Sequence, residues 1–564
     1  MASTETIVKE DLDVELQTEQ EHPENGLKGL KHWRQDMFAG FIVALVSVPL
    51  SLGIAMASGA PPIAGLFSEI IAGLVFPFLG GAYVTISGPA AGLAPVLYSS
   101  IAALGRGNME EGYHLVLGVI LIAGLVQIAL TYFKAARFSY IIPRSVVHGM
   151  LAAIGLLIVG KQIPNFFGYK SGAHEFLGYL AEIPTKLGVT NLSVVVTASI
   201  CLALLFLLPK TRFKWIKWMP AHLAVVLTGI GLGQLLRLDH RFLVDIPSDP
   251  LKHGLIMPDF VALFSDPTLL PTIIIAVFAL TIVDGTESLA TIHAVDQIDP
   301  YKRKSNPHRT LFAMGISNIC SAMVGGLTII PGIIKSTTNI IAGGRTAWVN
   351  FYNAVFLILF LLVFNELIKM IPVATLAAVL IHIGYKLAGP HKWSHVSKLG
   401  WDQLLIFTTT VLVTVSSDLL VGIACGILAK VLILVFYSMK CSCKRPHGLL
   451  RSLWINSIKL FRNPIKEVLV AGDQVEITFK GSLTCFNHLV VRDTIDKHLR
   501  SSKVIRLNLC PSVGVVDHSS TTYLQMLADE AELSGLARVE VSGLERLSCC
   551  TADLSSLHYR PRPV

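Results

Sequence analysis

The sequence predicts a polytopic membrane protein, all α-helical in its membrane part, with a small cytosolic α/β domain near its C-terminal end. Three observations support this fold class. Hydrophobic residues make up 52% of the 564 residues and charged residues 15%, whereas soluble globular proteins carry about 25% charged residues. Between Met37 and Gly105 the only charged residue is Glu69, and no water-soluble domain runs that long with one charge. After Tyr437 the apolar runs stop, and short strand-like and helical stretches alternate.

Residues 1–36 are expected to form an acidic cytosolic tail. The first 27 residues contain eight acidic side chains and one basic side chain, Lys9. Such a start is neither a signal peptide nor a transit peptide, because both of these are basic and poor in acids.

Residues 37–439 are expected to form the membrane domain. A spanning helix needs about 20 mostly apolar residues, and twelve segments meet that need. Two further segments, 87–104 and 331–344, are too short and too rich in Gly and Pro for ordinary spans. We therefore expect fourteen membrane segments. The twelve full spans are 37–58, 63–80, 112–133, 144–163, 190–209, 219–236, 269–294, 309–328, 347–367, 371–388, 403–420 and 421–439.

Basic residues gather in every second loop, and Lys28, Lys31 and Arg34 precede the first span. Because cytoplasmic loops are enriched in Lys and Arg, we expect an even number of crossings, with both termini in the cytoplasm of a multi-pass plasma membrane (cell inner membrane) protein. The basic loops contain Lys134 and Arg137; Lys210, Arg212, Lys214 and Lys217; Lys302, Arg303, Lys304 and Arg309; Lys386, Lys392 and Lys398; and Lys440, Lys444 and Arg445.

The two short segments resemble each other. Each follows a double glycine, Gly80-Gly81 or Gly325-Gly326, and the two pairs lie 245 residues apart. This spacing predicts two repeats of seven segments, over about 37–236 and 269–439. An odd number of spans in each repeat gives the repeats opposite orientations, which is an inverted repeat.

Beyond the last span, residues 440–465 are expected to form a basic linker and residues 466–564 a small α/β domain. Runs rich in β-branched residues predict strands, and amphipathic stretches predict helices. The expected strands are 468–471, 475–479, 504–509 and 539–541, and the expected helices are 488–499 and 518–533.

The broken segments are candidates for an anion site. A half-helix that begins at the bilayer midplane exposes unpaired N–H groups and the positive end of its dipole. Two facing half-helices then form a site between repeats. The alternative is that both segments are kinks needed for packing. The candidate residues are Ser87, Gly88, Pro89, Ala90 and Ala91 at one start, and Gly332, Ile333, Ile334, Lys335 and Ser336 at the other.

Lys335 is the basic candidate inside an apolar segment. A charge there normally faces a partner or a water-filled cavity, so Lys335 is expected to add positive potential to the anion site. The alternative is that its side chain snorkels to the interface.

Asp284 and Glu287 are candidates for ion coupling within the span 269–294. Intramembrane carboxylates serve proton relays and cation coupling, and Thr291 lies one turn after Glu287. Glu287 and Thr291 could present oxygen atoms to a proton or to Na⁺. Asp284 is an equal candidate for this role. The alternative is a structural carboxylate paired with a base, and for Glu69 a structural role is favoured. The bases considered are Arg144, His148 and Lys161.

The chain shows no motif for catalysis, cofactors or nucleic acid. It has no P-loop, G-x-S-x-G, H-E-x-x-H or dinucleotide fingerprint. The nine cysteines form no C-x-x-C pair, so neither zinc nor a disulfide framework is implied. No arginine-rich stripe with interleaved aromatic residues is present. We expect a protein that is not an enzyme and that works without a cofactor or resident metal, driven by ion gradients or exchange.

In several of these segments the chain resembles the SulP anion permeases, a family of sulfate and bicarbonate carriers with pendrin and prestin among its relatives. The resemblance covers roughly residues 30–560, and the C-terminal part resembles a STAS domain. The residues that carry it are Val48-Pro49-Leu50-Ser51-Leu52-Gly53, Ala57-Ser58-Gly59-Ala60, Ile86-Ser87-Gly88-Pro89, Glu287 to Thr291, Gly315 to Asn318, Asn339 to Thr346, and Val516-Asp517-His518-Ser519-Ser520.

The resemblance implies two inverted repeats folded into a core and a gate domain, a homodimer, and a substrate held between the third and tenth segments. Lys335 stands where many members have Arg, and Glu287 stands at the coupling carboxylate, where a Na⁺-driven bicarbonate carrier has Asp. Leu50 replaces a Gln that is common in eukaryotic members. In the loop of the STAS domain, Asp517, His518 and Ser519 replace the phosphorylatable Asp-Ser-Ser pattern.

The expected function is secondary active transport of an inorganic anion, bicarbonate or sulfate, by alternating access, coupled to H⁺ or Na⁺ or run as exchange. Na⁺ would bind at Glu287 and Thr291. One alternative is a C4-dicarboxylate carrier of the same fold. Another is a membrane sensor or scaffold whose STAS domain binds a cytosolic protein. A nucleobase permease fits less well, because it would lack the C-terminal domain.

Overall fold

The computed structural model describes residues 23–133, 142–173, 176–210, 220–247, 249, 254–417, 419–441, 457–499, 502–534, 538–551, 553 and 555–559. Most of the predicted acidic tail, most of the predicted linker, and the basic loops at 134–141 and 211–219 lie outside these residues.

Within the described residues, every predicted full span coincides with a helix. Eight helical stretches are long and apolar enough to cross a membrane, and four apolar helices are shorter. The fourteen-segment count and its orientation stay predictions. The helices are α2 (Trp33–Ala57), α3 (Pro62–Leu79), α5 (Met109–Tyr132), α6 (Arg144–Phe167), α8 (Leu192–Leu207), α10 (Ala221–Leu235), α13 (Leu270–Ile298), α14 (Pro307–Met323), α16 (Trp348–Val363), α18 (Val373–Ala388), α20 (Trp401–Ser416) and α21 (Leu419–Cys441).

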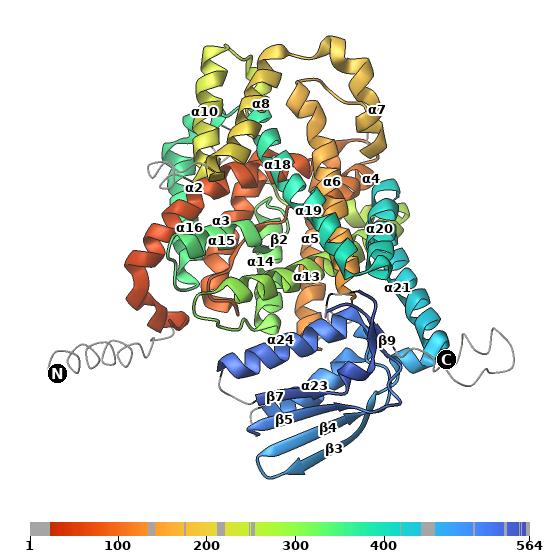
Figure 1. Ribbon diagram of the computed structural model, residues 1–564. Coiled ribbons are helices and arrows are strands. Elements are labelled where there is room, and N and C mark those ends of the chain that lie inside the picture. The colour runs from red at the N-terminus through yellow and green to blue at the C-terminus, as the bar shows by residue number, and fades with distance from the viewer. Residues whose placement is uncertain are drawn as a thin grey trace, which may run out of the picture.

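Helices from the two halves of the membrane part pack against one another. α16 lies against α2 and α3, α14 against α5, and α18 against α6, and Figure 1 shows the green α16 beside the red α2. These contacts define two groups. The first helix group contains α2, α3, α5, α13, α14 and α16, and the second contains α6, α8, α10, α18, α20 and α21. The two inverted repeats stay a prediction.

The two broken segments meet as a short antiparallel pair inside the first helix group. β1 (Ile86–Pro89) pairs with β2 (Ile329–Gly332), with Ile86 opposite Gly332 and Gly88 opposite Ile330. α15 (Ile333–Ile341) follows β2 at once, with Gly332 as its N-cap. α4 (Ala94–Leu104) begins only after a turn.

The predicted helix start at Ser87 to Ala91 is therefore wrong. Backbone groups in β1 are used by the pairing with β2, and an extended backbone cannot also be the first turn of a helix. The helix begins where the pairing ends, and Pro95, rather than Pro89, occupies its first turn.

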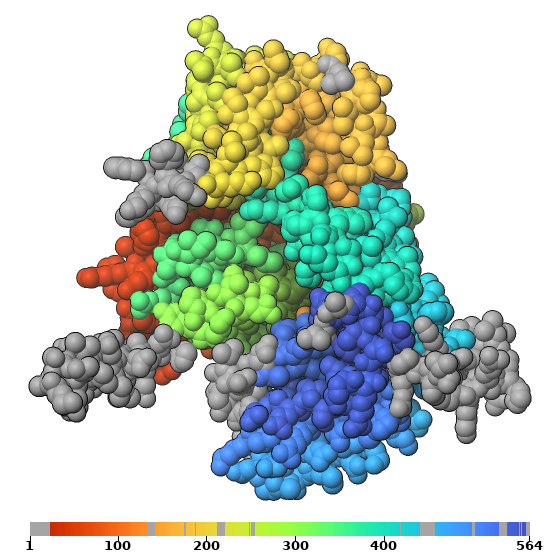
Figure 2. Space-filling view, in the orientation of Figure 1, coloured from red at the N-terminus to blue at the C-terminus, as the bar shows by residue number. Residues whose placement is uncertain are grey.

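The C-terminal domain folds as the sequence predicts. Its main sheet has the order β3 (Ile465–Ala471), β4 (Gln474–Phe479), β5 (Val504–Leu509) and β7 (Arg538–Ser542), antiparallel for the first pair and parallel for the rest. α23 (His488–Leu499) and α24 (His518–Ser534) accompany the sheet. Figure 2 shows this domain in blue against the helical part. Apolar side chains of β4, β5 and both helices form its core.

The C-terminal domain contacts the membrane part at the start of α24. Lys430 of α21 lies 3.2 Å from the Asp517 carboxylate, and both side chains are buried. The Ser519 hydroxyl accepts a hydrogen bond from the backbone N–H of Arg144, at the start of α6 (3.4 Å). The ring of Tyr437 lies 5.2 Å from that of Tyr559.

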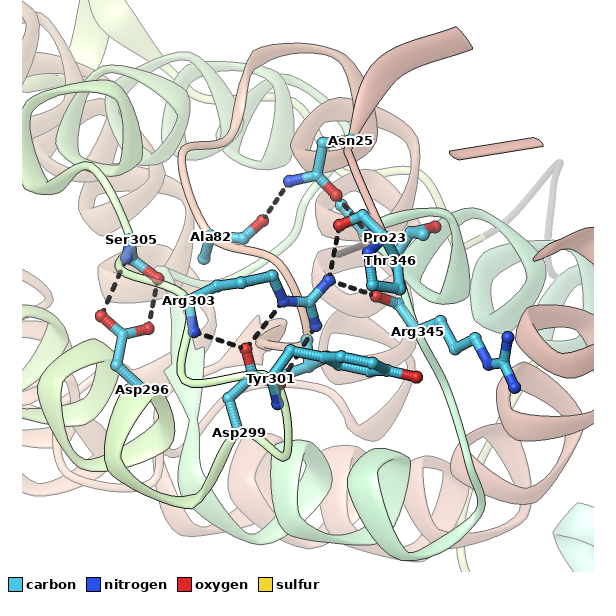
Figure 3. Close-up of polar contacts among 12 residues, drawn as sticks. Pro23, Asn25, Ala82, Asp296, Asp299, Tyr301, Arg303, Ser305, Arg345 and Thr346 are labelled. Carbon is cyan, nitrogen blue, oxygen red and sulfur yellow. Dashed lines mark hydrogen bonds and ion pairs between the residues drawn. The ribbon is translucent and has the colours of Figure 1, made fainter. Parts of the chain in front are cut away.

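A buried arginine ties the chain before α2 to the ends of the broken segments (Figure 3). The Arg303 guanidinium donates to the Asp299 carboxylate (2.8 and 3.1 Å) and to the carbonyls of Pro23 (2.7 Å) and Arg345 (2.8 Å). Arg345 follows α15. The amide of Asn25 donates to the carbonyl of Ala82, in the loop that precedes β1 (2.8 Å). This cluster therefore fixes one end of each broken segment.

Candidate anion site

The paired strands bring the two predicted half-sites together. Ser336 links them, because its hydroxyl accepts from the backbone N–H of Ile86 (2.9 Å) and donates to the carbonyl of Gly332 (2.7 Å). A Cβ atom on Gly88 would collide with the ends of both Lys335 and Glu69. Residues 250 positions apart in the chain thus share one small region, as the sequence predicts for this site.

Lys335 forms a buried ion pair with Glu69. Its exposed fraction is 2%, so the alternative in which it snorkels to the interface is wrong. Glu69 also accepts hydrogen bonds from Ser47 (3.0 Å), Ser51 (3.0 Å) and Asn353 (3.1 Å). The structural role favoured for Glu69 is confirmed. The positive charge of Lys335 is consequently balanced, which the sequence could not reveal because its partner lies 266 residues away.

The turn between β1 and α4 carries unpaired hydrogen-bond donors. Among the described residues, nothing accepts a hydrogen bond from the backbone N–H groups of Ala90, Ala91, Gly92 or Leu93. The hydroxyl of Ser87 is also buried without a partner. Such a turn ahead of a helix, with the positive dipole end behind it, attracts negative charge.

Glu287 places its carboxylate at this same turn. A Cβ atom on Gly92 would collide with both carboxylate oxygens of Glu287, and its Oε2 atom is buried without a hydrogen-bond partner. No hydrogen bond joins Glu287 to Thr291 in the described part of the chain. The turn thus holds a carboxylate in the place that an anion would use.

Asp284 has a different environment from Glu287. Its carboxylate accepts from Gln127 (2.5 Å), Asn318 (3.0 Å) and Ser288 (3.4 Å). Asn318 in turn accepts from the backbone N–H of Ile329 in β2 (2.7 Å). Asp284 therefore joins α5, α13 and α14 to the strand pair, which is a positioning role.

The proposed pairing of these carboxylates with Arg144, His148 or Lys161 does not occur among the interactions of the described residues. Lys161 donates instead to the carbonyl of Ala57, and the guanidinium of Arg144 lies near Met526 (3.1 Å).

Two buried amides hold the strands, Asn339, which belongs to a motif named above, and Asn350, which was not predicted. Asn350 accepts from the backbone N–H of Ser87 (3.0 Å) and donates to the carbonyl of Thr85 (2.8 Å). Asn339 donates to the carbonyl of Val84 (2.7 Å). A polar amide within an apolar segment is the signal that could have found Asn350, because a buried amide needs partners.

Within the described residues, no group of three or more His, Cys, Asp or Glu side chains could hold a metal ion. A Na⁺ site at Glu287 and Thr291 stays a prediction.

The predicted loop of the C-terminal domain is buried in the contact with the membrane part. Asp517, His518 and Ser519 are exposed by at most 6%. Burial alone would raise the pKa of Asp517, but Lys430 and the backbone N–H groups of Ser520 and Cys485 hold this pKa below its usual value. Burial lowers the pKa of His518. The loop therefore acts as a docking surface.

Comparisons with known proteins agree with this geometry. The sequence profile of the sulfate permease family matches residues 33–410. The putative sulfate transporter YvdB of Bacillus subtilis is 28% identical over 403 residues, 71% of this chain and 73% of that protein. The bicarbonate transporter BicA of Picosynechococcus sp. is 26% identical over 401 residues, 70% and 69% of the two chains.

Two solved structures share the fold. The transmembrane domain of a cyanobacterium bicarbonate transporter BicA superimposes with a TM-score of 0.61 at 24% identity, over 70% of this chain and 98% of that one. The structure of SLC26A9 superimposes with a TM-score of 0.64 at 17% identity, over 91% of this chain and 84% of that one. The second match extends into the C-terminal domain, in agreement with a STAS domain.

Proposed function

The chain belongs to the sulfate permease family and is a multi-pass membrane anion transporter; from this premise we propose secondary active transport of bicarbonate or sulfate by alternating access. The observation that carries the proposal is the turn at Ala90 to Leu93. It combines unpaired backbone donors, the start of α4 and the carboxylate of Glu287.

The position of Glu287 favours proton coupling. An anion bound to the turn would lie within a few ångströms of a carboxylate, and two like charges 4 Å apart repel by about 4 kcal/mol at an effective dielectric constant of 20. Protonation of Glu287 removes this repulsion, and the neutral carboxyl group can then donate to the anion. Binding of the anion and of the proton therefore favour each other, which is the requirement for symport.

Na⁺ is the second coupling candidate, because a cation between Glu287 and the anion would also cancel the repulsion. Thr291 would supply a further oxygen. A proton needs a single acceptor oxygen, and the buried Oε2 atom of Glu287 supplies it. Na⁺ needs several oxygen ligands, and Glu287 and Thr291 alone provide few, so we favour the proton.

The experiment is uptake of labelled sulfate and labelled bicarbonate into proteoliposomes, with either a proton or a Na⁺ gradient imposed. We expect the proton gradient to drive uptake. Glu287→Gln should remove this drive while leaving exchange of anions across the membrane, and Glu366→Gln, which changes an exposed carboxylate outside the site, should match the parent chain.

Uptake of succinate but of neither inorganic anion would instead identify a C4-dicarboxylate carrier. Binding without flux would refute transport and support a sensor that acts through the C-terminal domain. If anion uptake lost its dependence on the imposed gradients in an Asp284 variant but kept it in Glu287→Gln, coupling would be assigned to Asp284.

The proposal includes a homodimer in the plasma membrane, with both termini in the cytoplasm and with a cytosolic protein as a further partner of the STAS domain. Labelling of a single cysteine at position 2 or 560 by an impermeant reagent added outside intact cells would refute this orientation.

A further inference from the structure

A cavity of about 140 Å³ lies between the two helix groups. Its wall is formed by the end of α2, by α4 and α6, by the end of α20 and the start of α21, and by α7 (Phe176–Lys186). Figure 1 shows α7 at the end of the molecule opposite the C-terminal domain, and we call that end the outer side. One water needs roughly 10–15 Å³ of such volume, so a small hydrated anion fits.

The cavity reaches the helix that begins at the candidate anion site. Ala94, the first residue of α4, belongs to its wall, together with Tyr98 and Ser99 one turn further on. The unpaired donors of the site directly precede Ala94. The cavity therefore lies along α4 between the candidate site and the outer side.

Lys161 of α6 is the cation in this wall. Its ammonium group donates to the carbonyl of Ala57, at the C-terminal end of α2, and lies 3.0 Å from the centre of the Tyr98 ring. An ammonium group has three donors. One is used by the carbonyl and one faces the ring, so the third is available to a ligand in the cavity.

Lys161 differs from three other cations buried among the helices. Lys335, Lys430 and Arg303 each lie beside a carboxylate, whereas the described residues provide none for Lys161. A cation within an apolar part of a membrane protein normally has a counter-ion or faces a water-filled cavity. Lys161 has the cavity and lacks a counter-ion among the described residues, so an anion from solution can supply the negative charge there.

We propose that Lys161 forms an outer anion-binding site, which holds a small inorganic anion in this cavity between the outer side and the site at the start of α4. This inference rests on the proposed function, since the ligand belongs to the same chemical class as the transported anion. The site joins the helix groups, because Lys161 belongs to the second group and the carbonyl that it contacts belongs to the first.

The test uses the full chain in proteoliposomes and an accessible reporter in the cavity. Ser99 is exposed and lines the cavity, so Ser99→Cys supplies a thiol for a negatively charged, impermeant thiosulfonate reagent. Sulfate or bicarbonate added on the outer side should slow this labelling, measured above the background of the parent chain.

Lys161→Met in the Ser99→Cys chain should raise the anion concentration for half protection at least fivefold, and Lys161→Arg should restore protection. Lys170→Met is the matched control, because it removes an exposed lysine just after α6. Equal protection with and without Lys161, or no protection in the Ser99→Cys chain, would overturn the proposal.

Transport gives a second readout. Lys161→Met should lower kcat/KM for uptake threefold to tenfold, and raised ionic strength should shrink the difference by screening the charge. Absence of uptake by the parent chain would refute the proposed function. Normal uptake with unaltered kcat/KM in Lys161→Met would refute only the outer site.

Discussion

The ion pair between Lys335 and Glu69 allows a decisive test of how the candidate site attracts anions. Lys335→Met removes the cation and leaves Glu69 buried without its counter-ion. Removing one partner of a buried ion pair costs about 3–5 kcal/mol. The charge of this region falls by one unit, so the variant should both unfold more easily and bind anions more weakly.

The double variant Lys335→Met, Glu69→Gln separates two explanations. Replacement of both partners by neutral groups restores the charge balance, and such replacements are often close to neutral in stability. If Lys335 acts by balancing Glu69, the double variant should recover most of the anion affinity that the single variant loses. At about 1.4 kcal/mol per factor of ten, loss of an interaction with one charged group, worth about 1.5–3 kcal/mol, corresponds to binding about tenfold to a hundredfold weaker.

The assays are titration calorimetry with sulfate or bicarbonate and thermal unfolding in detergent. Lys335→Arg, which keeps the charge, serves as the control and should be milder than Lys335→Met. A double variant that regains stability but binds anions as weakly as Lys335→Met would refute the balancing role and assign direct contact with the anion to Lys335.

Three further predictions concern packing, pH and the cluster of Figure 3. Gly92→Ala should reduce uptake at least fivefold, because its Cβ atom collides with the carboxylate of Glu287, whereas Gly285→Ala, with open space around it, should transport normally. Burial lowers the pKa of His488 to about 4 and also lowers that of His518. Because the unfolded chain then takes up these protons first, the C-terminal domain should lose stability as pH falls below about 6.5. Protease sensitivity that is unchanged between pH 7.5 and 5 would contradict this prediction. Arg303→Met leaves the buried Asp299 carboxylate without its counter-ion and should speed cleavage of the chain before α2 in limited proteolysis. An unaltered cleavage rate would count against the proposed role of this cluster.

The spanning helices were predictable because apolar length is a local property. The segments 144–163 and 371–388, for instance, became α6 and α18, since a continuous apolar stretch in lipid has to satisfy its backbone internally. The strands and helices of the C-terminal domain were predictable for a similar reason, because the spacing of apolar residues within each segment is also a local property.

The start of α4 was not predictable, because Gly88 and Pro89 are as compatible with the end of a strand as with the start of a helix. The pairing of Ile86 with Gly332 decided between them. Asp284 and Glu287 were equal candidates in the sequence. Gln127 and Asn318, which lie on other helices, donate to Asp284, whereas the Oε2 atom of Glu287 has no partner among the described residues.

The pairing of β1 with β2 has a consequence for how the cargo moves. The two halves of the binding region are joined by a strand ladder, by the Ser336 hydroxyl and by the Asn350 amide, so neither half can travel without the other. Under the proposed alternating access, a bound anion would then keep the same ligands whichever compartment the region faces. The preference among anions, measured as a ratio of affinities, should then be the same from both compartments, and only the route to the region should differ.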